Sequence, residues 1–347
     1  MDTVTTGPLP AAVTTRRPAV LRTGWFVVAL IVLALVCAAS VAFGARVISL
    51  DEIVSAFTGG GDGIAEAAVL QRVPRTVMAI LVGASLGLAG AVLQGVTRNP
   101  LADPQLLGVT SGASFFVVLG IAFFGLSNPF TYVWVAIAGC VLAAAFVYLI
   151  ASMGSGGPTP LKLALAGAVT AAALSSLVSV ILLPRITVMN EFRFWQIGGV
   201  GGATYDRALM ILPFLLVGVV ICAVSARRLN SLALGDDVAA GLGEHVMRTR
   251  MIASAGAFIL CGAATAVAGP IGFVGLVVPH VCRLLIGIDH RWLLPYSALV
   301  GAILLTTADV IGRVVARPSE VDVGIVTALV GAPFFIYIAR RQKVSAL

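Results

Sequence analysis

The feature of this chain that most restricts its fold is a succession of long apolar segments. Between Val77 and Val96 there is no ionisable side chain. About 20 apolar residues, rising about 1.5 Å each in an α-helix, are needed to span a hydrocarbon core of roughly 30 Å. The segment therefore predicts a helix that crosses a membrane.

Nine other apolar segments predict an all-α polytopic membrane protein with ten transmembrane helices. A soluble domain is excluded, because 59% of the 347 residues are hydrophobic and only 11% are charged. Gly269, Pro270 and Gly272 divide the longest apolar stretch into two short spans. The ten predicted spans are residues 25–44, 76–96, 106–126, 131–152, 161–183, 208–225, 251–269, 271–288, 292–311 and 321–339.

The basic residues predict that both termini lie in the cytoplasm. With ten spans, 14 of the 22 Lys and Arg residues fall on the side of the termini and 8 on the other side. Cytoplasmic loops carry the excess of Lys and Arg in membrane proteins. The net charge of +7 therefore reflects membrane topology and not binding to nucleic acid.

Small residues recur through the second span, at Gly83, Gly87 and Gly90. In lipid such residues let neighbouring backbones approach closely, so this helix is expected to lie inside a bundle. A polar turn with two prolines follows it, from Arg98 to Pro104.

Four ordered motifs carry a resemblance to a known family. Arg72-x-Pro74-Arg75 precedes a Gly/Ala-rich helix, and Gln94 is followed by Asn99-Pro100-Leu101-Ala102. The later motifs are GPIGFVGLVVPH at 269–280, with Arg283 and Asp289-His290-Arg291 after it, then 309–313 and GIVTALVGAP at 324–333. Over residues 49–340 the chain resembles the FecCD family of ABC transporter permeases, which includes importers of vitamin B12 and iron(III)-siderophores.

The resemblance implies a type II ABC importer fold, in which inverted repeats relate spans 2–5 to spans 7–10. It implies one permease subunit of a bacterial inner (plasma) membrane importer, together with a second permease copy or paralogue, two ATPase subunits and an extracytoplasmic substrate-binding protein. We expect a ferric siderophore as substrate, with vitamin B12 and haem as alternatives. The sequence does not specify the chelate.

The chain itself is expected to be a transport subunit and not an enzyme. No Gly-Lys-Ser/Thr phosphate-binding motif occurs in it, so ATP and Mg are expected on a separate ATPase. No metal site and no cofactor of its own are expected. The predicted domains are a disordered cytoplasmic tail at 1–22 and a single transmembrane permease domain at 23–347.

The inner loop at 227–250 is longer than its neighbours, and loops of this length in compact folds are usually functional. Asp236 and Asp237 suit the start of a short helix. The resemblance implies that this loop seats in the ATPase, whereas a solvated basic loop would leave its Ala/Gly pattern unexplained. The expected coupling residues are Leu234, Gly235, Ala239, Ala240, Gly241, Leu242 and Gly243.

The resemblance also implies that Arg72, Arg75 and Arg313 dock acidic residues of the binding protein on the outer side. The alternative is that Arg72 and Arg75 reach the lipid interface while Arg313 neutralises Asp309, which lies four residues earlier on one helix face. Thr159, in the inner turn after span 4, is a candidate for the cytoplasmic gate, or belongs to a simple linker.

Two other classes of membrane protein compete with the ABC permease. An ion-coupled secondary transporter would use an intramembrane carboxylate, and Asp309 is the candidate. The pairing of Asp309 with Arg313 favours a structural role for this carboxylate. A channel or membrane scaffold is the third possibility. Transport by an ABC importer depends on ATP, whereas transport by a secondary transporter or a channel does not.

Overall fold

All regular secondary structure in the described part of the chain is α-helical, as the apolar segments predict. The computed structural model describes residues 19–44, 50–58, 63–103, 108–126, 128–153 and 159–341. The helices are α1 (Ala19–Ala42), α2 (Leu50–Thr58), α3 (Gly63–Thr97), α4 (Val109–Phe124), α5 (Pro129–Ser152), α6 (Pro160–Leu182), α7 (Ile186–Gln196), α8 (Tyr205–Leu232), α9 (Asp236–Gly241), α10 (Val246–Ala268), α11 (Val274–Ile286), α12 (His290–Val315) and α13 (Val323–Arg341).

Each of the ten predicted spans corresponds to one apolar helix. Among the described residues, seven helices are long and apolar enough to cross a membrane: α1, α3, α5, α6, α8, α10 and α12. The apolar parts of α4, α11 and α13 are shorter, at 10–17 residues. The ten-span count needs these three helices to cross as well, so it stays a prediction.

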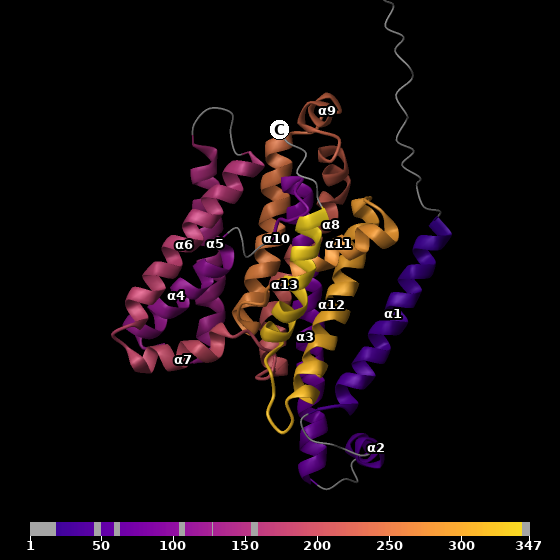
Figure 1. Cartoon of the computed structure of the whole chain (residues 1–347), viewed down its shortest axis with the longest axis vertical. Helices are drawn as coiled ribbons and strands as arrows, with labels where there is room; N and C mark the ends of the chain where they lie inside the picture. Colours follow the sequence, from indigo (N-terminus) through magenta and orange to yellow (C-terminus); the bar gives the residue numbers. More distant parts are fainter. Residues whose placement is uncertain are drawn as a thin grey trace, which may run out of the picture.

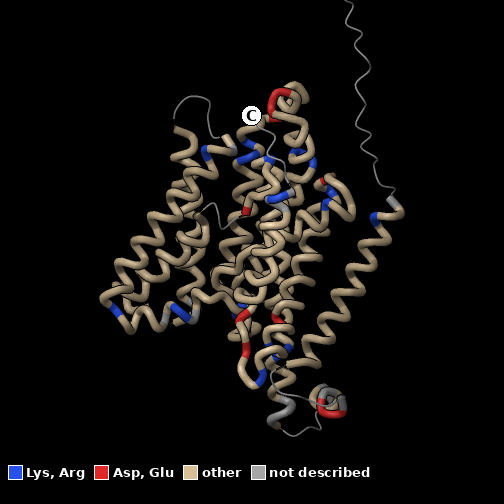
Figure 2. The backbone as a smooth tube through the Cα atoms, in the orientation of Figure 1, with Lys and Arg blue, Asp and Glu red and all other residues tan. Residues whose placement is uncertain are grey.

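Charged residues gather toward two ends of the helix bundle and leave an uncharged middle zone (Figure 2). One end carries α9 and the C-terminal end of α13, and the other carries α2, α7 and the turn between α12 and α13 (Figure 1). We call these the α9 end and the α2 end. An uncharged zone between two charged ends is what a bilayer requires of a bundle that crosses it.

Helix α3 lies in the centre of the bundle, as its small residues predict. In its most apolar window 78% of the residues are buried, against 6% for α1. A Cβ on Gly90 would overlap the carbonyl oxygen of Gly275 in α11, and a Cβ on Gly83 would overlap that of Gly301 in α12. Glycine at these positions therefore lets three helices pack backbone to backbone.

The apolar stretch after α10 is broken where glycine and proline predict the break. Helix α10 ends at Ala268, Gly269 adopts a φ of 68°, and α11 begins at Val274. Backbone groups at this break are paired within the protein: the N–H of Gly199 donates to the carbonyl of Ala268 at 2.8 Å, and the N–H of Gly269 donates to the carbonyl of Thr265 at 2.8 Å. Non-helical backbone at membrane depth is tolerated only with such protection.

Several helices extend beyond the predicted spans. Residues 1–18 of the predicted tail lie outside the described residues, but residues 19–22 are helical and belong to α1. The predicted loop at 227–250 is shorter than expected, because α8 continues through Leu232 and α10 already begins at Val246. Hydropathy marks where a helix leaves lipid and not where its hydrogen bonding stops. The polar last turn of α8 and the polar first turn of α10 therefore resemble loop in the sequence.

Candidate functional site

Polar side chains gather at both ends of α3. At the α2 end, Arg72 and Arg75 of α3 meet Arg313 of α12 and Arg317 just after it, and these four residues are called the arginine cluster. Two of them, Arg75 and Arg313, bind Asp309 of α12, whose side chain is 1% exposed. The cluster therefore contains both the predicted docking arginines and the predicted intramembrane ion pair.

Asp309 is shared by two guanidinium groups. Arg75 donates to it from Nε at 3.0 Å and from Nη2 at 2.8 Å. Arg313 Nη2 lies 2.9 Å from the other carboxylate oxygen, with a side chain 2% exposed. Both arginines thus satisfy one buried carboxylate, since an unpaired charge in this position would be costly.

The other donors of the arginine cluster hold the C-terminal end of α1. Arg72 Nη1 donates to the carbonyls of Val41 and Ala42, both at 2.9 Å. Arg313 donates to the carbonyl of Ser40 at 3.0 Å, and Arg317 donates to that of Gly44 at 2.9 Å. Carbonyls at the end of a helix lack intrahelical partners and carry partial negative charge, so these guanidiniums cap α1 and tie it to α3 and α12.

Two carboxylates of the turn before α13 stand at the exposed side of the cluster. Glu320, with a side chain 40% exposed, accepts from Arg75 Nη1 at 2.6 Å. Asp322 follows two residues later in the same turn and is partly buried. The exposed rim of the cluster is therefore acidic as well as basic.

This arrangement bears on the predicted docking of a binding protein. Arg72 is 7% exposed and Arg313 is 1% exposed, and both already hold acceptors within the chain. The side chain of Arg75 is 12% exposed and is already bound by Asp309 and Glu320. Docking by these arginines stays a prediction, while an internal role in joining α1, α3 and α12 is present in the structure.

At the α9 end, residues 233–245 form a short hairpin, here called the α9 hairpin. Gly235 and Gly243, with φ of 108° and 84°, turn the chain before and after α9. Ala239 is fully buried, whereas Ala240, Gly241 and Gly243 are exposed. The predicted small-residue face is thus divided: Ala239 packs inward and Ala240 faces outward.

An apolar stripe covers the outside of the α9 hairpin. Leu234 is 62% exposed, Val238 51% and Leu242 63%. Val238 and Leu242 are four residues apart at the end of α9, so they lie on one side of it, and Leu234 lies just before the turn at Gly235. These large apolar side chains belong to the α9 hairpin, which lies at the α9 end of the bundle (Figure 1). Such a patch at a polar end of a protein marks an interaction surface.

Ion pairs fasten this hairpin to the ends of two helices. Asp236 Oδ1 lies 3.1 Å from Arg98 Nη2, just past the end of α3, and 2.9 Å from Arg250 Nη2, in the first turns of α10. The side chain of Arg250 is 6% exposed. Arg228 of α8 lies 3.9 Å from Glu244.

Asn230, in the last turn of α8, joins this helix to the start of α12. Its Oδ1 accepts from the backbone N–H of His290 at 2.9 Å, and its Nδ2 donates to Asp289 Oδ1 at 2.7 Å. Burial alone would raise the pKa of Asp289, but the bonds from Asn230 and from the N–H of Arg291, with the charge of Arg22, hold this pKa below its ordinary value. Asn230 therefore caps α12 from a neighbouring helix.

A further contact joins two of the sequence motifs. Arg283 Nη2 donates to Gln94 Oε1 at 2.5 Å, and Gln94 Nε2 donates to the carbonyl of Gly275 at 3.1 Å. Gln94 is 2% exposed, so these bonds are made away from water. They link α3 to both ends of α11.

The predicted gate residue has a local structural contact. Thr159 is exposed and caps the N-terminus of α6, where its hydroxyl accepts from the N–H of Lys162 at 3.3 Å. Its role in a gate stays a prediction. Residues 154–158 of the same turn lie outside the described residues.

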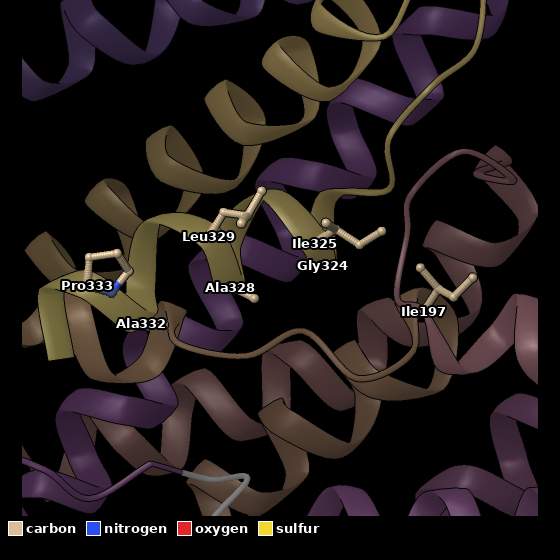
Figure 3. Close-up of a pocket in the computed structure, with 7 residues that line it drawn as sticks. All are labelled: Ile197, Gly324, Ile325, Ala328, Leu329, Ala332 and Pro333. Carbon is tan, nitrogen blue, oxygen red and sulfur yellow. The ribbon is translucent and has the colours of Figure 1, made fainter. Parts of the chain in front are cut away.

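One face of α13 forms the wall of an open apolar groove of about 630 Å³ (Figure 3). Ile325, Leu329 and Pro333 follow one another at intervals of four residues, and Ile197 lies across from them. Ile325 is 44% exposed and Leu329 is 69% exposed. Within the described part of the chain, no other helix covers this face of α13.

Sequence patterns did not identify Arg98, Asn230, Asp236 and Arg250 as functional candidates. These polar residues come from four segments up to 152 positions apart, and no local motif pairs them. The only signal was the accumulation of charged residues near the ends of predicted spans. No group of three potential metal ligands comes together in the described part of the chain.

Comparison with known proteins identifies the family. The model of the FecCD transport family matches residues 30–341. The chain belongs to the FecCD transport family. A ferric enterobactin transport system permease protein of Escherichia coli K12 is 43% identical over 315 residues, which cover 90% of this chain and 94% of the relative.

Other FecCD relatives agree. An Fe(3+)-citrate import system permease protein of Bacillus subtilis 168 is 43% identical over 325 residues, covering 92% of this chain and 95% of the relative. A solved structure described as an inward-facing conformation of a metal-chelate type ABC transporter superposes with a TM-score of 0.80 at 29% identity, covering 92% of this chain and all of that chain. This FecCD chain is thus a multi-pass ABC transporter permease of the inner membrane, with the all-helical permease fold.

Proposed function

We propose that this chain is one of the two transmembrane subunits of an ATP-driven importer for ferric siderophores. The observation that carries the proposal is its similarity, over nine-tenths of its length, to permeases named for ferric enterobactin and Fe(3+)-citrate transport. Vitamin B12 and haem remain alternative substrates of the same machinery. Residues 23–347 would then act as a single permease domain.

In this proposal the α9 hairpin docks a separate ATPase, which binds ATP and Mg. Support comes from the exposed apolar side chains of Leu234, Val238 and Leu242. The two glycine turns at Gly235 and Gly243 present this surface away from the bundle. ATP-driven closure of the ATPase dimer would move the hairpin and, through it, the transmembrane helices.

The membrane topology follows from the same assignment. The α9 end would face the cytoplasm with both termini, and the α2 end would face the outside, giving ten spans. The open groove on α13 would face the second permease copy or paralogue, with the transport pathway between the two.

An extracytoplasmic binding protein would dock at the α2 end. The arginines Arg72, Arg75 and Arg313 remain the proposed receptors for its acidic residues. Because Glu320 already binds Arg75 Nη1 at 2.6 Å, an incoming carboxylate would first compete with Glu320. Such charge contacts fix orientation and speed the encounter more than they add affinity.

The secondary transporter is the competing class, and one observation counts against it. A proton-coupling carboxylate must gain and lose a proton, but Asp309 is held by two guanidiniums at 2.8 and 2.9 Å. By binding Arg75 of α3 and Arg313 of its own helix, Asp309 joins α3 to α12, which is a structural role.

The proposed function is tested in proteoliposomes that contain the permease with its copurified ATPase and the binding protein on the outside. We expect uptake of ⁵⁵Fe presented as a panel of ferric siderophores, dependent on ATP inside the vesicles. Labelled cobalamin and haemin are the comparison substrates. Uptake driven by a proton gradient without the ATPase would disprove the ABC mechanism, and uptake of cobalamin or haemin alone would disprove the substrate.

A further inference from the structure

We propose that Asp236 is a positioning residue that transmits motion from the ATPase into the helix bundle. By binding Arg98 and Arg250 together, it fastens the α9 hairpin to the ends of α3 and α10. This inference rests on the proposed function of the hairpin as the ATPase docking surface, and it adds how movement of that surface reaches the transport pathway.

The hairpin has few other attachments. Helix α9 has six residues, and only Ala239 in it is buried. Its remaining ion pair in the described part of the chain joins Glu244 to Arg228 of α8, at 3.9 Å. Without the bridge at Asp236, a hairpin with so few packing contacts would move with the ATPase while α3 and α10 stayed in place.

One carboxylate makes the bridge to two helices that do not follow each other in the chain. Asp236 Oδ1 lies 3.1 Å from Arg98 Nη2 and 2.9 Å from Arg250 Nη2, and Oδ2 lies 3.1 Å from the same atom of Arg250. The side chain of Arg250 is 6% exposed, whereas those of Asp236 and Arg98 are 40% and 37% exposed, so the buried partner of the bridge lies in α10. Movement of Asp236 therefore acts on α3 and α10 at once.

The backbone at Arg98 is a second, independent observation. Arg98 follows Thr97, the last residue of α3, and adopts a φ of 50° in the left-handed region. Helices commonly end in this conformation with glycine, because a side chain there is unfavourable. An arginine at a position that favours glycine indicates that its side chain has a function that offsets the cost of the strained backbone. Binding Asp236 is such a function.

Helix α3 can carry the motion across the membrane. It runs for 35 residues from Gly63 to Thr97, about 52 Å at the usual rise. Its far end holds Arg72 and Arg75 of the arginine cluster, which binds α1 and α12. A rigid element that joins two polar clusters is a physical route for coupling between them.

The chain supplies a matched control beside Asp236. Asp237 is the next residue of the same first helical turn and is exposed. It has no ion-pair partner among the described residues. Asp236→Asn and Asp237→Asn therefore remove the same charge from the same turn, and only the first breaks the bridge.

The experiment measures hydrogen exchange in the complex of permease and ATPase in nanodiscs, with and without ATP and vanadate. The probes are peptides of the α9 hairpin and of residues 316–323, at the opposite end of the bundle. In the unsubstituted complex we expect nucleotide to change exchange at both places. Asp236→Asn should keep the change in the hairpin and lower the change at 316–323 by about threefold or more, within the range for positions along such a route.

Two further variants separate transmission from folding. Arg98→Gly removes the half of the bridge that reaches α3, while the contact of Asp236 with Arg250 remains and the strained backbone is relieved. It should therefore copurify the ATPase normally and, because α3 carries the motion, lower the remote change as Asp236→Asn does. Asp236→Glu should restore part of the remote change, and Asp237→Asn should match the unsubstituted complex.

The outcomes are distinct. A full remote change in Asp236→Asn and Arg98→Gly would overturn the transmission role. Loss of the ATPase from these two variants alone would also overturn it, since the bridge would then build the docking surface. An unsubstituted chain that binds no ATPase would instead disprove the proposed function itself.

Discussion

Replacing Asp309 by asparagine is the most informative test of the arginine cluster. The substitution keeps the size of the side chain and one acceptor oxygen, but it removes the charge shared by Arg75 and Arg313. Arg313 would then be a cation with a side chain 2% exposed, left with carbonyl and hydroxyl acceptors. Arg75 would keep only the carboxylate of Glu320.

The expected loss follows from this burial. Removing one partner of a buried ion pair costs about 3–5 kcal/mol. Glu320→Gln is the matched control, because it removes the exposed partner of the same Arg75, where a loss of about 0.2–1 kcal/mol is expected. Asp309→Asn should therefore lower the melting temperature several times more than Glu320→Gln.

The protein carries its own reporter for this measurement. Cys140, Cys222, Cys261 and Cys282 are buried free thiols in the described part of the chain. A maleimide dye that fluoresces on reaction follows their exposure as the detergent-solubilised protein is heated. If Asp309→Asn melts no earlier than Glu320→Gln, the reasoning about the buried pair is wrong.

Three other perturbations test the packing, the hairpin and the titration of Asp289. Gly90→Ala should destabilise the fold by about 1–3 kcal/mol in the same assay, because its Cβ meets a carbonyl of α11, while Gly24→Ala, with no atom within 4 Å, should be neutral or slightly stabilising. Ala240 is exposed, so Ala240→Glu should abolish copurification of the ATPase while the permease stays folded. Ala239 is buried, so Ala239→Glu should also lower the melting temperature. An Ala240→Glu permease that binds the ATPase normally would exclude this surface as the docking site. The pKa of Asp289 is lowered in the folded state, so its stabilising charge is present above its ordinary pKa of about 3.9 and is lost as pH falls below that value. The stability difference between the original chain and Asp289→Asn should therefore be constant from pH 7 to 5 and shrink below pH 4. A difference that stays constant to pH 3 would contradict the shift.

The sequence predicted the helices well because each membrane helix is specified locally. Ten apolar segments correspond to ten helices, and the break at Gly269 falls where the residues predict it. The central place of α3 follows from Gly83 and Gly90, since only small residues allow its backbone contacts with α12 and α11. The family was also readable from motifs, which lie in single segments.

The ends of the helices were less predictable. The predicted loop at 227–250 is longer than the observed hairpin, because the polar final turn of α8 and the polar first turn of α10 resemble loop in composition. Hydrogen bonding continues into water as long as helix-forming residues allow it. Likewise α3 begins at Gly63, well before its apolar span.

The sequence by itself determined that this protein is a bundle of membrane-crossing helices of the FecCD type, because periodicity, length and charge act within one segment. Only the tertiary structure decided which charges meet. The spacing of four predicted the pair of Asp309 and Arg313, but no pattern showed that Arg75 shares the same carboxylate or that Arg72 binds the carbonyls at the end of α1. The bridge of Arg98 to Asp236 joins residues 138 positions apart. Such pairs depend on how helices pack in three dimensions, and no local pattern encodes that packing.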